Sequence, residues 1–185
     1  RPEIADYPFT TLKPQLGMVK VGDSSFVMAD LPGLIEGASE GKGLGHEFLK
    51  HIERCRLIIH VLDMSREDPI KDYEIINEEL KKYPGNLASR PQIVVANKMD
   101  MDEDKTNLNK FKEKYPDIEI FEVITIINEG LRPVLFKCKD MLKDLPQFPL
   151  YNPNNAESFL LLLHIQLILQ KNFHIFYSRL MLEAM

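Results

Sequence analysis

The sequence has little of several things, and each shortage excludes a class of protein. Only two cysteines occur in 185 residues, Cys55 and Cys138, and both lie in apolar runs, which indicates buried thiols in a reducing compartment rather than a disulfide framework. The first residues contain no basic region followed by an apolar core, so we expect no secretory signal and a cytoplasmic location. The net charge of -5 gives no general argument for binding nucleic acid, and we expect a local basic cluster that includes Arg56 to be solvated.

Long apolar runs are also missing. The longest covers residues 159–169, is interrupted by His164 and Gln166, and falls short of the ~20 residues that a membrane-spanning helix needs, so we predict no membrane segment. The surrounding tail, residues 152–185, is rich in Leu, Ile and Phe, and as a helix it would be apolar on most faces. It is either a packing or partner-binding helix or a sticky segment that promotes aggregation. We place the domain boundary near Tyr151, with domain 1–151 followed by tail 152–185 of unknown role.

Strand-length apolar runs alternate with helical patterns through the first 151 residues, which is typical of a parallel sheet flanked by helices. The expected strands are residues 25–30, 56–63, 92–97 and 118–125. The expected helices are residues 46–55, 68–85, 106–115 and 130–146. The sequence therefore predicts an α/β fold with a mainly parallel sheet.

Two short motifs follow expected strands, at the end of a parallel sheet where ligands bind. "DLPG" begins at Asp30, and "NKMD" covers residues 97–100. Asp30 suits a water of an Mg²⁺ shell, and Gly33 allows a backbone N–H to approach a γ-phosphate. Asp100 suits the N1–H and exocyclic amine of guanine, while Asn97 can meet the opposite edge and the stem of Lys98 can cover the base. The plainer alternative for "NKMD" is a polar turn.

Two flexible segments accompany these motifs. "DYPFTT" offers two adjacent hydroxyls ahead of Asp30, and a threonine in a mobile loop can bind Mg²⁺ and the γ-phosphate until that phosphate leaves. Residues 31–45 contain five glycines, at positions 33, 37, 41, 43 and 45, so this segment tolerates backbone conformations that other residues resist. Ordinary surface loops are the alternative for both segments.

The stretches "ADYPFTTLKPQLG", "DLPGLIEGASEGKGLGHEFLKHIERCR" and "NKMD" together resemble the G domain of the Obg family of P-loop GTPases, over about residues 1–151. The resemblance implies a Ras-like G domain that binds and slowly hydrolyses GTP to GDP with Mg²⁺. It further implies a role in ribosome biogenesis, with the large ribosomal subunit or its rRNA as partner, no membrane and a monomeric state.

The resemblance also assigns the site residues. Residues 9–13 correspond to the first switch loop, residues 31–45 to the second, and residues 124–126 to the fifth guanine-binding loop. The metal ligands are Thr11 and, through water, Asp30. The nucleotide-binding set is Phe9, Thr10, Thr11, Leu12, Lys13, Asp30, Leu31, Pro32, Gly33, Asn97, Lys98, Met99, Asp100, Ile124, Thr125 and Ile126.

The sequence departs from the family pattern at several points. The phosphate-binding motif G-x-x-x-x-G-K-[ST] does not occur, so the resemblance implies that the first strand, the phosphate loop and the first helix are lacking, together with the glycine-rich N-terminal domain. The missing strand belongs in the middle of the sheet. At the fifth loop, Ile124 and Thr125 replace the usual Ser-Ala. Leu34 stands where Ras-like GTPases place the glutamine that orients the attacking water, so no catalytic side chain is assigned.

The sequence thus predicts a GTPase domain that is inactive as given, because its main phosphate site is missing. The alternative is a non-catalytic binding module, a remnant whose switch surface or apolar tail holds a ribosomal or protein partner without nucleotide turnover.

Overall fold

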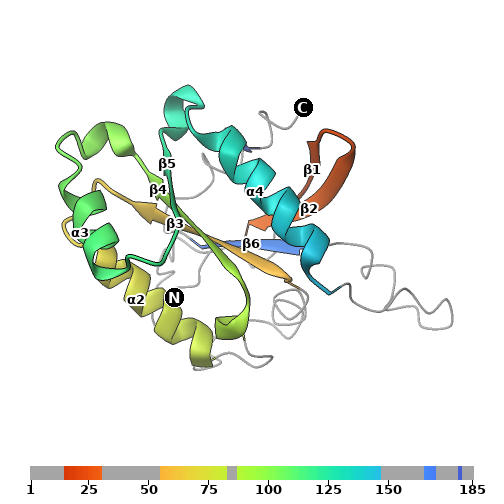
Figure 1. The fold of residues 1–185 in the computed structure, drawn as a ribbon, viewed down its shortest axis with the longest axis horizontal. Coiled ribbons are helices and arrows are strands. Elements are labelled where there is room, and N and C mark those ends of the chain that lie inside the picture. The colour runs from red at the N-terminus through yellow and green to blue at the C-terminus, as the bar shows by residue number, and fades with distance from the viewer. Residues whose placement is uncertain (1–14, 31–54, 83–86, 147–164, 170–178, 181–185) are drawn as a thin grey trace, which may run out of the picture.

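A computed structural model describes residues 15–30, 55–82, 87–146, 165–169 and 179–180 (Figure 1). The strands are β1 (Gln15–Val21), β2 (Ser24–Asp30), β3 (Leu57–Asp63), β4 (Gln92–Asn97), β5 (Ile120–Val123) and β6 (Ile165–Leu169). The helices are α2 (Pro69–Lys82), α3 (Thr106–Lys114) and α4 (Leu131–Asp144), with short 3-10 turns η2 (Leu87–Ser89), η3 (Met99–Met101) and η4 (Thr125–Ile127). Among these described helices, none is long and apolar enough to cross a membrane.

The strands form one mainly parallel sheet in the order β1-β2-β6-β3-β4-β5. Only β1 is antiparallel, and it joins β2 through a tight turn at Gly22 and Asp23, where Gly22 has a φ of 60°. The sequence did not lead us to expect β1. The Gly-Asp pair between two short alternating runs is the signal that marks this hairpin.

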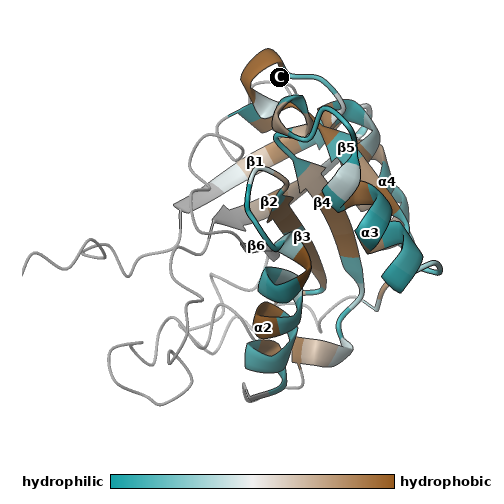
Figure 2. Cartoon of the chain, turned by 90° about the vertical axis from the view of Figure 1, so that its left-hand side faces the viewer, coloured by the Kyte–Doolittle hydropathy of each residue, from teal (hydrophilic) through white to brown (hydrophobic). Residues whose placement is uncertain are grey.

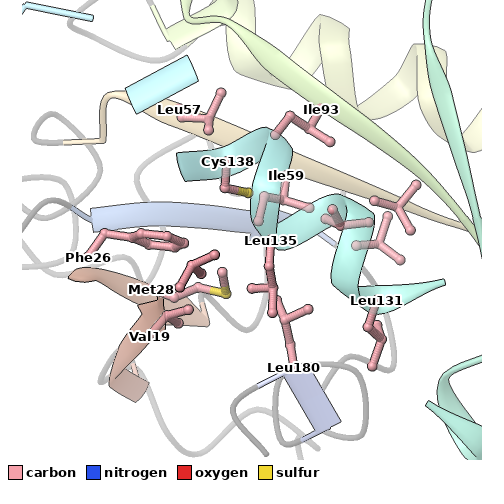
Figure 3. Close-up of a cluster of buried hydrophobic side chains, with 14 of the residues drawn as sticks. Val19, Phe26, Met28, Leu57, Ile59, Ile93, Leu131, Leu135, Cys138 and Leu180 are labelled. Carbon is pink, nitrogen blue, oxygen red and sulfur yellow. The ribbon is translucent and has the colours of Figure 1, made fainter. Parts of the chain in front are cut away.

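Helix α4 covers one face of the sheet, and its apolar stripe explains why. Leu131, Leu135 and Cys138 point from α4 onto residues of the strands, among them Ile59 and Ile93 (Figure 3). All five are nearly or fully buried, so α4 and the sheet share one core. Leu180, from the far end of the chain, is fully buried in the same core.

Helices α2 and α3 pack on the opposite face, where alternate residues of β3 and β4 meet them. Tyr73 of α2 stacks edge-on against Phe111 of α3, with ring centroids 5.2 Å apart, and both lie in a cluster with Leu62 and Val94. Hydropathy follows this layering, because β3 is mostly apolar, with His60 and Asp63 as its polar residues, whereas the outer helix α3 is largely hydrophilic (Figure 2). The burial of β3 from both sides accounts for its almost continuous apolar sequence.

Strand β6 corrects two expectations about the tail and the sheet. Residues 165–169 form a strand, not part of an apolar helix. This strand lies parallel to both β2 and β3, in the middle of the sheet, where the family resemblance predicts a gap. A parallel strand there pairs the two inner edges that would otherwise carry unpaired backbone groups.

Other expectations have definite outcomes. Cys55 and Cys138 are buried thiols that form no disulfide, as predicted. Arg56 was expected to be solvated, and this was wrong: it is 4% exposed, and its guanidinium donates to the carbonyl oxygens of Leu142 and Leu145 at the end of α4. A cation there satisfies carbonyls that the helix leaves unpaired. Of the helix expected at residues 46–55, only Cys55 lies within the described residues.

Candidate guanine-nucleotide site

Three parallel strands end in polar residues at the same edge of the sheet. Asp30, Asp63 and Asn97 are the last residues of β2, β3 and β4, and Asp63 pairs directly with Asn97 in the register of β3 and β4. Because the carboxyl ends of parallel strands meet at one edge, these residues surround a single region above the sheet. Asp30 is placed by its backbone, opposite Ile168 of β6.

The loop after β4 has a constrained backbone. Lys98 has a φ of 61° and a ψ of 42°, the left-handed conformation that is uncommon outside glycine, and the chain then enters η3 with Met99 and Asp100. The turn is closed by a hydrogen bond of 2.9 Å from Met101 N to Lys98 O. The carboxylate of Asp100 is exposed on this turn, as a residue that reads a ligand must be.

Asn97 joins this loop to the loop after β5. Its side chain is only 6% exposed, and its Oδ1 accepts hydrogen bonds from Thr125 Oγ1 at 2.5 Å and from Thr125 N at 3.4 Å. Thr125 is itself buried, so the contact is shielded from water. The two segments that the sequence predicts to bind guanine, 97–100 and 124–126, are therefore held together by their own side chains.

The loop after β5 turns back sharply on that strand. Ile124 and Glu129 exchange backbone hydrogen bonds of 3.0 and 3.1 Å, which close η4 into a compact turn. Gly130 has a φ of 78°, and a Cβ there would meet Glu122 O at 2.1 Å, so only glycine fits. The side chain of Ile126 is 65% exposed on this turn.

Asp63 is a polar residue of the site that the sequence interpretation missed. Its Oδ2 accepts from Lys98 Nζ at 2.7 Å, and its Oδ1 accepts from Ser65 Oγ at 2.6 Å and Ser65 N at 3.1 Å. Burial alone would raise the pKa of Asp63, but the hydrogen bonds from Lys98 and Ser65 and the Lys98 charge lower it below its usual value. The sequence feature that could have identified Asp63 is its position at the end of a predicted buried strand, which is also the position of Asp30.

A buried carboxylate fixes the start of α3. Asp102 is 7% exposed and accepts from Asn107 N at 3.2 Å and Leu108 N at 3.0 Å. Asn107 in turn donates through Nδ2 to Met64 O and Arg66 O, both at 3.0 Å. These bonds tie the loops after β3 and β4 to α3, so the edge of the sheet is braced from one side.

The remaining predicted residues lie outside the described part of the chain. They are the first-switch residues Phe9, Thr10, Thr11, Leu12 and Lys13 and the second-switch residues Leu31, Pro32 and Gly33. Their roles stay predictions, as do the roles of the described site residues toward a ligand.

Comparison with known proteins gives the family. Residues 1–98 match the family model described as 50S ribosome-binding GTPase. GTPase Obg of Bacillus pumilus is 58% identical over 157 residues, which are 82% of this chain and 37% of that protein. GTPase Obg of Anoxybacillus flavithermus is 53% identical over 163 residues, which are 85% of this chain and 38% of that protein.

A solved structure agrees on the fold. The structure of Era in complex with MgGDPNP and nucleotides 1506-1542 of 16S ribosomal RNA matches with a TM-score of 0.52 and 21% identity, and covers 80% of this chain and 49% of that chain. The P-loop GTPase fold is thereby shown, and the chain spans little more than a third of the length of its Obg relatives. The chain belongs to the Obg family of GTPases, within the 50S ribosome-binding GTPases.

Proposed function

We propose that this chain forms the base-binding part of an Obg-type G domain that takes guanine nucleotides together with Mg²⁺. The observation that carries the proposal is the buried contact between Asn97 and Thr125. This contact brings the loops after β4 and β5 together at the carboxyl edge of the sheet, where parallel sheets bind ligands, and the relatives of the chain are GTPases. Each loop alone would be an ordinary turn.

The described residues have distinct tasks in this proposal. The exposed carboxylate of Asp100 accepts from the N1–H and the exocyclic amine of guanine, a pair of donors that adenine does not present. The stem of Lys98 supports the base. Because Asn97 Oδ1 is engaged by Thr125, contact with the base falls to its Nδ2 amide group. In the loop 124–126, the backbone N–H groups of Ile124 and Thr125 already donate to Glu129 O and Asn97 Oδ1, so the backbone N–H of Ile126 would complete the recognition of the base.

The oxygen ligands assigned to the metal suit Mg²⁺, which prefers carboxylate and hydroxyl oxygen and keeps several waters. Asp30 ends β2 at the same edge as the base loops, and Thr11 would complete the pair. When bound, Mg²⁺ neutralises charge on the phosphates. Gly33 would approach the γ-phosphate through its backbone N–H.

For a complete G domain of this type, the proposed reaction is attack of water on the γ-phosphate of GTP, with catalysis by positioning and charge stabilisation. Leu34 cannot orient that water, so we expect slow turnover that depends on backbone groups or a partner. The sequence contains no G-x-x-x-x-G-K-[ST] motif. We therefore expect the chain as given to bind guanine nucleotide weakly and to hydrolyse GTP no faster than buffer does.

The large ribosomal subunit or its rRNA is the partner that the family description supports, and the cytoplasm is the matching location. The competing proposal is a non-catalytic module that holds a ribosomal or protein partner without nucleotide. It rests on the same missing phosphate motif. Nucleotide binding separates the two.

The test is a titration of the purified chain with fluorescent GDP, GTP and ATP in Mg²⁺. We expect binding of GDP and GTP and none of ATP. Asp100→Asn should move the preference toward xanthosine nucleotides, whose base carries the complementary acceptor. Equal affinity for guanine and xanthine nucleotides in both forms would contradict the assignment of Asp100, and no binding of any nucleotide would favour the non-catalytic module.

A further inference from the structure

The ion pair between Lys98 and Asp63 is built into the site more firmly than a surface pair. The Asp63 side chain is 12% exposed and the Lys98 side chain 38% exposed, and the two charged atoms lie 2.7 Å apart. Exposed pairs contribute little because both partners are free to move. Here the Asp63 carboxylate is also held independently of Lys98, since its other oxygen accepts two hydrogen bonds from Ser65.

The backbone at Lys98 sets the direction of the side chain. Lys98 is one of three non-glycine residues with positive φ among the described positions, and it follows β4 directly. Its ammonium reaches the carboxylate at the end of the neighbouring strand β3. The four-carbon stem therefore spans the carboxyl edge from β4 to β3, with the ammonium anchored at the far end.

We infer that Asp63 is a positioning residue for the guanine-nucleotide site, because it holds the Lys98 stem across the sheet edge as a preformed support for the base. This inference rests on the proposed function, since Lys98 needs a preset conformation only if a ligand lies on it. A free lysine would lose its rotamer freedom when the nucleotide binds, and Asp63 removes that cost in advance.

The test compares Asp63→Asn with the parent chain in fluorescent GDP titrations. Asparagine keeps the oxygen that accepts from Ser65 but removes the charge that holds Lys98. We expect about two- to tenfold weaker GDP binding, the effect of one side chain that must be ordered on binding. The titration is run at 1 M salt as well, where the screening length is about 3 Å, because the lost negative charge also increases the attraction for phosphate.

Two further variants separate positioning from a general loss of structure. Lys98→Met keeps much of the stem but not the ammonium, so Asp63→Asn should cause no further loss of affinity in that background. Glu122→Gln is the matched control, because Glu122 is another carboxylate that holds lysines, Lys105 and Lys112, on the neighbouring strand β5. It should leave GDP affinity unchanged.

An independent measurement reports on Lys98 itself. Its acylation rate, followed by mass spectrometry with Lys105 as internal reference, should rise several-fold in Asp63→Asn. Equal GDP affinities and equal acylation rates in parent and Asp63→Asn would overturn the inference while the proposed function stands. If Asp63→Asn weakened binding equally in the Lys98→Met background, the effect would be structural and the inference would also be overturned. A parent chain that binds no guanine nucleotide would overturn the proposed function and this inference with it.

Discussion

Removal of residues 151–185 should unfold the sheet, because β6 is the one strand that joins its two parts within the described structure. In the strand order, β2 and β3 each pair with β6 and not with each other. Loss of β6 leaves the β1-β2 hairpin separated from the three-stranded unit β3-β4-β5. Isolated hairpins are at best marginally stable in water, and this one would keep only the packing of its apolar residues against α4 and the shared core.

The size of the effect follows from the register. β6 pairs with four residues of β2 and with four of β3, so about eight backbone hydrogen bonds depend on it. At about 0.5–1.5 kcal/mol net for each bond, the loss is about 4–12 kcal/mol. The buried side chain of Leu180 adds about 2–5 kcal/mol, by analogy with truncation of a core leucine to alanine. Domains of this kind have a total stability of about 5–15 kcal/mol, so the truncated chain should be largely unfolded at 25 °C.

The assay is urea denaturation followed by circular dichroism, for the full chain and for a chain that ends at residue 150. Leu180→Ala is the milder variant, and Met18→Ala is its control, because the Met18 side chain is 60% exposed and Leu180 is fully buried. We expect Leu180→Ala to lower the urea midpoint and Met18→Ala to change stability by less than about 0.5 kcal/mol. An unchanged midpoint and m-value in the truncated chain would refute the central place of β6.

Two other predictions concern the core and the site. His60 is fully buried, and burial lowers its pKa to about 4, only partly offset by the hydrogen bond with Gln92. Between pH 6.5 and 4 the unfolded chain therefore binds more protons than the folded chain. The free energy of unfolding, measured in urea, should fall by up to about 1.4 kcal/mol per pH unit as the pH drops through that window. His60→Gln should remove this pH dependence. Thr125→Val removes the hydroxyl that donates to Asn97, so it should lower the free energy of unfolding by about 1–3 kcal/mol and weaken GDP binding. Thr125→Ser keeps the hydroxyl and should retain both the stability and the GDP affinity. Equal GDP affinity in all three forms would contradict the role of this contact.

Strongly patterned elements of the fold could be predicted from the sequence. The strand expected at residues 92–97 is β4, Gln92–Asn97, and the helix expected from Asp68 begins at Pro69 with Lys71 N donating to Asp68 Oδ1 at 2.9 Å. These elements carry their own signals, an apolar run of strand length and an N-cap followed by proline.

The tail strand could not be predicted in this way. The run that contains β6 is apolar without a clear period, so the local sequence does not distinguish strand from helix. The two edges of β2 and β3 decide the outcome, because a strand between them pairs on both sides. Such tertiary context overrides local preference.

The site likewise has a part that the sequence predicts and a part that depends on the tertiary structure. The motifs at 97–100 and 124–126 are visible as sequence, and the structure brings them together through Asn97 and Thr125. The pairing of Lys98 with Asp63 is not visible, because it depends on a left-handed backbone at a lysine, where the sequence offers no glycine as a marker. A rule that examines every strand end, including the end of β3, would still have selected Asp63.

The tail strand β6 and the base-binding loops contact different parts of β3. β6 pairs with residues 57–60 of β3, whereas Asp63 lies at the end of that strand, beside Asn97. The contacts that organise the base loops, from Asp63 to Lys98 and from Asn97 to Thr125, lie within β3, β4, β5 and the turns that follow them. Loss of β6 therefore removes one neighbour of β3 without removing any of these contacts directly. Leu180→Ala should accordingly lower the stability of the chain while leaving the GDP affinity of the folded fraction close to that of the parent. Asp63→Asn should instead lower the GDP affinity while leaving the stability close to that of the parent.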